Sequence, residues 1–412
     1  MTYHATLNYI HSLERFGMKP GLGRVRALCE ALGSPQEQLK FIHVAGTNGK
    51  GSTCTMLAEI CAAAGMKTGL YTSPYVIEFR ERMQVNGAMI SEADLCRLTA
   101  LVREKAETLP EPVTEFEFIT ALAFAWFREQ NCDVVVLEVG LGGRLDATNV
   151  IPAPLCSVIM KIAYDHMDVL GNTLALIAGE KCGIIKPRSP VVTTCEQPEE
   201  ALAVIRATAR RHGCELTAPE MHRCEIISSG ITGTQAVLDG LPVRVPLLGE
   251  HMARNALTAV MTARLLGIPD EAIQTGIAAA RIPARMELLR AEPLTILDGG
   301  HNPDCARALA AALSQYLPGQ RLCAICGMMA DKDVAAYLSI LRPYISQLIT
   351  CTPRNPRAMA AEDLAARARG LGYQNTTPAA SIEEALRAAE HPLLICGSFY
   401  FAGEIRNSIA IR

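Results

Sequence analysis

The sequence lacks both a long hydrophobic run and an excess of charge of one sign. No stretch of about 18 consecutive apolar residues occurs, and the N-terminus has no basic segment followed by an apolar core. The chain of 412 residues carries 39 Lys and Arg against 42 Asp and Glu, a formal net charge of -3. This balance excludes a global basic field for nucleic acid or anionic lipid. We expect a cytoplasmic protein with no nucleic-acid or membrane partner, in which any anion site is local.

A disulfide framework is also missing. The 15 cysteines are an odd number without a repeating spacing, and most lie in apolar stretches. Cys323 and Cys326 form a Cys-x-x-Cys pair, but no second pair follows at the spacing of a zinc site. The sequence favours reduced thiols in a buried strand over a redox or metal pair.

The length and the apolar pattern indicate an α/β protein with more than one domain. Hydrophobic residues make up 50% of the chain, too many for a disordered protein, and its length exceeds the usual span of one domain. Short apolar runs alternate with helical patterns, which is typical of a mainly parallel sheet covered by helices. The expected strands are residues 41–45, 134–139, 156–162, 294–297, 322–326, 347–351 and 393–396, and a helix is expected over 53–64. The weakly patterned, proline-containing segment 282–293 places a domain boundary near residue 288, between a larger part at 1–288 and a smaller one at 289–412.

The strongest local signal is a glycine-rich segment between a predicted strand and a predicted helix. Residues 43–53 read HVAGTNGKGST. Glycines let backbone N–H groups turn toward phosphate oxygens, the helix N-terminus adds partial positive charge, and Lys50 can reach the outer phosphates. Ser52 or Thr53 would then face Mg²⁺ or a phosphate. The usual spelling GxxxxGK[ST] is not met at Val44 and Gly51, so a glycine-rich turn with an exposed lysine is the alternative.

One acid, Glu138, lies near the end of an otherwise apolar predicted strand. A buried carboxylate is costly without a partner, and ligands bind at the carboxyl edge of a parallel sheet. A metal beside the phosphate loop would be such a partner. An ion pair with an arginine of the polar loop 142–149, such as Arg144, is the alternative.

A histidine follows the next predicted strand. His166 lies in the segment YDHMD at residues 164–168, on the same predicted rim as Glu138. A lone histidine is usually a satisfied polar residue, but this position favours a ligand. Lys181 and Lys186 follow one helix later and are candidate phosphate or solvent contacts.

Together these motifs resemble the folylpolyglutamate synthase and dihydrofolate synthase family, within the ATP-dependent Mur ligase superfamily. The matching segments run in order along essentially the whole chain: GTNGKGS at 46–52, TSP at 72–74, ERMQVNG at 81–87, LEVGLGGRLDATN at 137–149, DHMD at 165–168, EKCGIIKP at 180–187, GEHMARNA at 249–256, DGGHNP at 298–303, GMMADKD at 327–333 and GSFYF at 397–401. Two positions depart from the family pattern. Tyr75 stands where His is frequent, and Gly300 stands where Ala is usual.

The resemblance implies an α/β fold, with a P-loop-containing ATPase domain on a mainly parallel sheet and a smaller Rossmann-like C-terminal domain. It also implies the roles of particular residues. Nucleotide contacts are expected from Thr47, Asn48, Gly49, Lys50, Gly51, Ser52, Asn255, Arg285 and Asp298. Metal contacts are expected from Ser73, Glu138, His166 and Lys181, with Lys181 carbamylated. The pterin is expected at Thr114, Glu115, Phe116, Glu117, Asp146 and Ala147, the incoming glutamate at His301 and Ser398, and catalysis at Lys50, Lys181 and His301.

The activity implied is ADP-forming ligation of L-glutamate to a reduced folate, and also to dihydropteroate, through an acyl phosphate. ATP and Mg²⁺ are the expected cofactors, K⁺ is a further candidate cation, and a monomer is expected. The rival interpretation is a Mur-type ligase for a different carboxylate, although the 45 residues before Gly46 leave no room for a UDP-sugar domain. A P-loop binding or switch protein would leave DGGHNP and GSFYF without a role.

Overall fold

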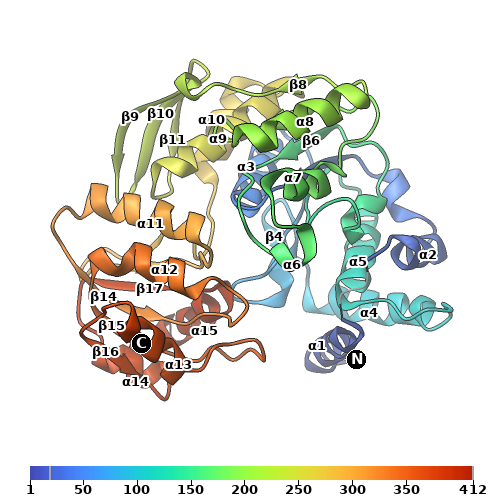
Figure 1. The fold of residues 1–412 in the computed structure, drawn as a ribbon. Coiled ribbons are helices and arrows are strands. Elements are labelled where there is room, and N and C mark those ends of the chain that lie inside the picture. The colour runs from blue at the N-terminus through green and yellow to red at the C-terminus, as the bar shows by residue number, and fades with distance from the viewer. Residues whose placement is uncertain (18–19, 411–412) are drawn as a thin grey trace.

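Two sheets, each covered by helices on both faces, form the two main parts of the chain (Figure 1). The computed structural model describes residues 1–17 and 20–410. The first sheet has the strand order β4-β3-β2-β5-β1-β6-β7-β8. Its strands are β1 (Phe41–Ala45), β2 (Thr68–Tyr71), β3 (Met83–Val85), β4 (Ala88–Met89), β5 (Val134–Glu138), β6 (Cys156–Ile159), β7 (Val191–Thr193) and β8 (Leu216–Thr217). The pairs from β2 to β8 are parallel, so the carboxyl ends of β5, β1 and β6 lie side by side.

Residues of the central strand β5 are buried alternately on the two faces of this sheet. Val134 and Val136 belong to the core under α3, α9 and α10, whereas Val135 and Leu137 belong to the core under α1, α2, α4 and α5. These helices are α3 (Lys50–Ala63), α9 (Glu250–Leu265), α10 (Asp270–Ala279), α1 (Tyr3–Ser12), α2 (Gly23–Ala31), α4 (Glu92–Ala106) and α5 (Glu115–Glu129). Burial on both faces explains why the strand has no polar residue before its last one.

The second sheet repeats this arrangement on a smaller scale. Its order is β12-β13-β17-β14-β15-β16, and only the β12–β13 pair is antiparallel. The strands are β12 (Glu287–Arg290), β13 (Thr295–Leu297), β14 (Leu322–Cys326), β15 (Ile345–Thr350), β16 (Thr376–Pro378) and β17 (Leu393–Cys396). The helices are α11 (Pro303–Tyr316), α12 (Val334–Leu341), α13 (Ala361–Gly370), α14 (Ile382–Ala388) and α15 (Phe399–Ala410). The predicted α/β class with mainly parallel sheets is confirmed.

The segment 282–293, where the sequence predicts a domain boundary, contains the first strand of the second sheet. β12 begins at Glu287 and already pairs with β13 of the second sheet. A boundary at residue 288 would therefore lie inside a strand, and we propose the segment between α10 and β12 as the division.

A third, antiparallel sheet lies beside α9 and was not predicted. It consists of β9 (Cys224–Gly230), β10 (Gly233–Leu238) and β11 (Leu241–Val245). In β11 buried and exposed residues alternate, and Asp239 and Gly240 form the turn before it. An Asp-Gly pair between alternating runs is a hairpin signal, so the sequence did contain a sign of this sheet.

The predicted elements are present, with shifted ends. The strand expected over 156–162 ends at Ile159 because the backbone carbonyl of Lys161 instead accepts the N–H groups of Thr47 and Asn48. The helix expected from residue 53 begins at Lys50, directly after Gly49 in a left-handed conformation (φ 83°). Cys323 and Cys326 lie in buried β14, and all 15 cysteines are free thiols. Within the described ranges, no helix has the length and apolarity needed to cross a bilayer.

The packing of α10 on α3 requires a glycine at position 276. A Cβ atom added to Gly276 would lie 2.4 Å from both Cα and N of Ile60 in the α3 backbone. We expect Gly276→Ala to lower the free energy of unfolding by about 1–3 kcal/mol, because the two helices must move apart. The control is Gly179→Ala in α7 (Leu174–Cys182), where nothing lies within 4 Å of the added atom. Urea unfolding that gives both variants the same stability would contradict this account.

Candidate active site

The phosphate loop connects β1 to α3 and is held by the end of β6. The N–H and hydroxyl of Thr47 donate to Lys161 O at 2.9 Å and Ala163 O at 3.1 Å. Lys50 is half-buried, and its Nζ donates to Thr47 O at 3.2 Å. The lysine is therefore folded over the loop, and the alternative of an exposed lysine on a simple turn does not hold.

Asn255 of α9 lies directly against this loop. A Cβ atom at Gly49 would be 2.7 Å from Asn255 Oδ1. Because residue 49 also has a positive φ, only glycine allows this approach without strain. The structure thus places the predicted nucleotide residue Asn255 beside the start of α3.

Glu138 ends β5 next to the phosphate loop. Its side chain is 4% exposed, and its Oε2 accepts the N–H of Ser73 at 3.1 Å. Burial raises the pKa of Glu138, while the nearby charge of Lys50 lowers it. The alternative pairing with Arg144 is wrong, because the Arg144 guanidinium pairs with Glu180 of α7 at 2.8 Å.

Lys181 approaches the same loop from α7. Its side chain is 4% exposed, and Nζ donates to Gly46 O at 2.9 Å. Burial and the charge of Lys50 lower its pKa to about 7. An amine with this pKa is substantially neutral at physiological pH. A neutral amine is a nucleophile and can form a carbamate.

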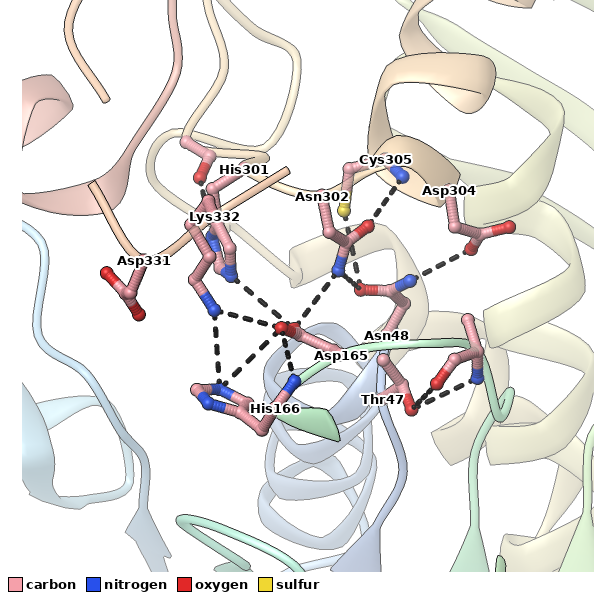
Figure 2. Close-up of polar contacts among 12 residues, drawn as sticks. Thr47, Asn48, Asp165, His166, His301, Asn302, Asp304, Cys305, Asp331 and Lys332 are labelled. Carbon is pink, nitrogen blue, oxygen red and sulfur yellow. Dashed lines mark hydrogen bonds and ion pairs between the residues drawn. The ribbon is translucent and has the colours of Figure 1, made fainter. Parts of the chain in front are cut away.

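His166 and Asp165 follow β6 and face the second part of the chain (Figure 2). Asp165 Oδ1 accepts from Lys332 Nζ at 2.9 Å, and Asp165 Oδ2 lies 3.8 Å from His301 Nε2. Burial would raise the pKa of Asp165, but His301 and Lys332 hold it well below its usual range. Burial lowers the pKa of His166 to about 4, so its ring is neutral and can act as a ligand.

The start of α11 contacts the phosphate loop directly. Asn302 caps this helix by accepting the N–H of Cys305, and its amide donates to Asn48 Oδ1 at 3.1 Å. The Asn48 amide donates to Asp304 Oδ2 at 2.9 Å, and Asp304 also pairs with Lys161 at 2.8 Å. Figure 2 shows Asn48, Asn302 and Asp304 converging between the two parts. Sequence reasoning missed Asn302 and Asp304, although Asn followed by Pro is a helix-start signal.

Asp298 and Arg285 lie at the junction of the two parts. Asp298 follows β13 and accepts the N–H groups of Met286 at 3.0 Å and Gly300 at 2.9 Å. Burial raises its pKa, and the charge of Arg285 lowers it. The Arg285 guanidinium lies 4.2 Å from the ring centre of Phe399.

A cleft of about 840 Å³ runs between the carboxyl edges of the two sheets. It brings together most of the predicted substrate and metal residues. Its lining includes Ser73, Thr114, Glu115, Phe116, Glu117, Asp146, Ala147, His166, His301 and Ser398. Such a position is where ligands bind in open α/β sheets.

Glu138 instead lines a neighbouring, smaller cavity together with Gly51, Ser73 and Arg285. Within residues 1–17 and 20–410, no three His, Cys, Asp or Glu side chains are grouped closely enough to hold a metal. The metal set predicted at Ser73, Glu138, His166 and Lys181 therefore stays a prediction.

Some of the predicted substrate residues already have structural partners. Glu117 forms a capping box with Thr114 and an ion pair with Arg24 at 2.9 Å. Asp146 accepts the N–H groups of Leu141 and Thr148, at 2.9 and 3.0 Å. These groups shape the wall of the cleft, whatever they also bind.

Two family models match the chain. The Mur ligase middle domain covers residues 44–263, and the glutamate ligase domain of the Mur ligases covers residues 284–398. Among curated proteins, the folylpolyglutamate synthase of Lacticaseibacillus casei is 37% identical, with 99% of each chain covered. The dihydrofolate synthase/folylpolyglutamate synthase of Bacillus subtilis is 36% identical, again with 99% of each chain covered.

Solved structures agree over the same length. A Mycobacterium tuberculosis folylpolyglutamate synthase complexed with ADP has a TM-score of 0.89 at 32% identity and covers 98% of both chains. A complex described as FPGS–AMPPCP–folate has a TM-score of 0.85 at 36% identity and covers 99% of this chain and 100% of that one. The likeness therefore extends over both parts of the fold.

The pH dependence of stability tests the wall of the cleft. The His43 ring in β1 is completely buried, and its Nε2 lies 2.9 Å from Thr148 Oγ1, which donates to Asp146 at 2.5 Å. Burial lowers the pKa of His43 from 6.5 to about 3. Between these values the unfolded chain binds a proton that the folded chain does not, so stability falls as the pH falls.

We expect this histidine to contribute up to about 1.4 kcal/mol per pH unit in that window. Between pH 6.5 and 5, His43→Gln should lower the slope of the unfolding free energy against pH by the contribution of close to one proton. Urea unfolding at several pH values measures the slope separately from any uniform destabilisation. An unchanged slope would show that His43 does not titrate as described.

Proposed function

Because the chain belongs to the folylpolyglutamate synthase/dihydrofolate synthase family of Mur ligases, we propose that it joins L-glutamate to a folate carboxylate with cleavage of ATP to ADP and phosphate. The observation that carries this proposal is the docking of the phosphate loop on α11, through Asn48 to Asn302 and Asp304. It lets the nucleotide side and the glutamate-ligase side share one cleft. The relatives whose structures hold ADP, or AMPPCP with folate, cover nearly all of this chain.

The reaction takes place in two balanced steps. A carboxylate oxygen of the folate attacks the γ-phosphorus of ATP, the bond from this phosphorus to the β–γ bridging oxygen breaks, and ADP leaves. The amine of glutamate then attacks the acyl carbon, and phosphate leaves with the former carboxylate oxygen. Of the two protons that the ammonium group loses, one ends on phosphate and one in solvent. Positioning and charge neutralisation supply most of the rate in such a transfer.

The phosphate loop and the junction hold the nucleotide in this proposal. Lys50 contacts the outer phosphates, and backbone N–H groups at the start of α3 contact their oxygens. The remaining nucleotide residues are Thr47, Asn48, Gly49, Gly51, Ser52, Asn255, Arg285 and Asp298. Arg285 and Asp298 act at the junction, so nucleotide binding also favours the docked arrangement of the two parts.

Mg²⁺ would be held beside the phosphate loop, where it would neutralise charge on the triphosphate. Glu138 is buried and forms no ion pair with any described residue, which suits a carboxylate that has a cation as its partner. Ser73 and His166 complete the proposed contacts. The near-neutral amine of Lys181 is suited to react with CO₂, giving a carbamate and a proton, and an intact-mass measurement in bicarbonate tests this. K⁺ stays a further candidate cation.

The cleft orients both organic substrates. Residues 114–117 with Asp146 and Ala147 line the side proposed for the pterin. His301 and Ser398 line the opposite side, which is proposed for glutamate. Reduced folate and dihydropteroate are both candidate substrates. The monomeric state and the cytoplasmic location stay predictions from the sequence.

ADP release tests the function. Purified protein is supplied with ATP, Mg²⁺ and L-glutamate, and in parallel with tetrahydrofolate, with dihydropteroate or with neither, and the products are weighed by mass spectrometry. Turnover with tetrahydrofolate that yields a product one glutamate longer supports the proposal. No turnover with either pterin, despite tight ATP binding, would mean that the protein acts on a different carboxylate.

Lys50 provides the first variant. We expect Lys50→Ala to lower kcat by about 100-fold or more, because charge on the transferred phosphoryl group loses its fixed cation. The matched control is Lys40→Ala, an exposed lysine just before β1. Both proteins should keep the wild-type thermal midpoint. Near-normal turnover in folded Lys50→Ala would refute the assigned role.

A further inference from the structure

The segment ERMQVNG at residues 81–87 has no role in the site described above. It closes the loop that carries Ser73, and the backbone N–H of Thr72 donates to Arg82 O at 3.1 Å. The carboxylate of Glu81 accepts the N–H groups of Val76, Ile77 and Glu78 at 2.8–3.0 Å. The loop is therefore tied across its base and through its middle, and the backbone of Arg82 is fixed next to Ser73.

The side chain of Arg82 reaches the main cleft and lies against two aromatic rings. Its guanidinium carbon lies 5.2 Å from the ring centre of Tyr75 and 5.8 Å from that of Phe79. Its Nε is buried and has no acceptor among the described residues. The rings hold the guanidinium in place, and this nitrogen makes no hydrogen bond to the part of the chain that the structure describes. The residue also lines the cleft, together with Ser73 and Phe116.

The other arginines and lysines that line the cleft are each paired with an acid. Arg144 pairs with Glu180 at 2.8 Å, Lys332 with Asp165 at 2.9 Å, and Arg357 with Asp331 at 3.7 Å. Among the described cleft residues of this kind, Arg82 is the one with no ion pair. A half-buried cation without an ion pair is costly, and an anionic ligand in the cleft would offset that cost.

Arg82 also lies close to the place where the chemistry occurs. Its neighbour Ser73 donates its N–H to Glu138, and Glu138 adjoins Gly51 of the phosphate loop. In the proposed reaction a substrate carboxylate must approach a negatively charged phosphate at this edge. Arginine is always charged, and its fork of N–H donors matches a carboxylate in two parallel hydrogen bonds.

We propose that Arg82 binds the substrate carboxylate that attacks ATP. The inference rests on the proposed ligase function and adds the residue that positions the nucleophile. The guanidinium donates from its two terminal nitrogens to the two carboxylate oxygens, and the rings of Tyr75 and Phe79 hold it in place. It thereby offsets the repulsion between carboxylate and triphosphate before the new oxygen–phosphorus bond forms.

The test compares folate with its γ-carboxamide, which lacks the reacting anion. Equilibrium binding of both compounds is measured with AMPPCP and Mg²⁺ present, in wild type, Arg82→Met and Arg82→Lys. The matched control is Arg80→Met, because Arg80 lies in the same short helical turn, pairs with Glu78 at 2.9 Å and is not in the cleft lining. AMPPCP affinity and the thermal midpoint are recorded for each protein.

We expect wild type and Arg80→Met to bind folate about 10- to 100-fold more tightly than the amide. Arg82→Met should bind the two about equally, with unchanged AMPPCP affinity, and Arg82→Lys should keep part of the preference. If Arg82→Met does not fold, the reduced preference of Arg82→Lys carries the test.

Three outcomes would overturn the inference: a full preference for folate in both Arg82 variants, a loss of AMPPCP affinity that matches the loss of folate affinity, or a wild type without any preference. Wild-type ligase turnover separates the two proposals. If the wild type turns over as a ligase but the Arg82 variants keep the preference, only the proposed role of Arg82 is rejected. If the wild type has no turnover, the proposed function itself is rejected.

Discussion

The docking of the phosphate loop on the start of α11 is the interaction on which the site depends. Asn48 is a loop residue of the first sheet, yet its amide group is bonded to Asn302 and Asp304 of the second part. Lys161 adds an ion pair to the same Asp304. These contacts set two carboxyl-end edges face to face, which is what makes a cleft shared by nucleotide, folate and glutamate possible. Neither sheet alone has both walls.

Burial shifts the pKa values of the ionisable groups around this contact in opposite directions. It raises the pKa of Glu138 and Asp298, and it lowers the pKa of Lys181 to about 7 and that of His166 to about 4. Groups that are costly to bury persist where they serve a ligand or a reaction. Here they surround the proposed triphosphate and metal positions. Bound ligands would therefore supply partners for buried groups that lack enough partners in the protein alone.

The sequence predicted the local features of the site and missed the distant ones. The phosphate loop and the acid at the end of β5 are visible because strand, turn and helix signals are contiguous, and burial on both faces makes β5 uniformly apolar. The contact from Asn48 to Asp304 joins residues 256 positions apart, which no local pattern encodes. The sequence alone allows an ion pair between Arg144 and Glu138, whereas the position of α7 brings Glu180 within 2.8 Å of the Arg144 guanidinium. The sequence analysis does not predict the antiparallel sheet β9–β11, although the Asp-Gly pair of its turn is visible in the sequence.

The central claim is that a folate carboxylate becomes an acyl phosphate in this cleft. The most direct measurement follows oxygen: folate substrate labelled with heavy oxygen in the reacting carboxylate is turned over with ATP and L-glutamate, and the released phosphate is analysed by mass spectrometry. The account predicts that one labelled oxygen passes from the carboxylate to phosphate in each turnover. Glutamate ligation that leaves the phosphate unlabelled would contradict it.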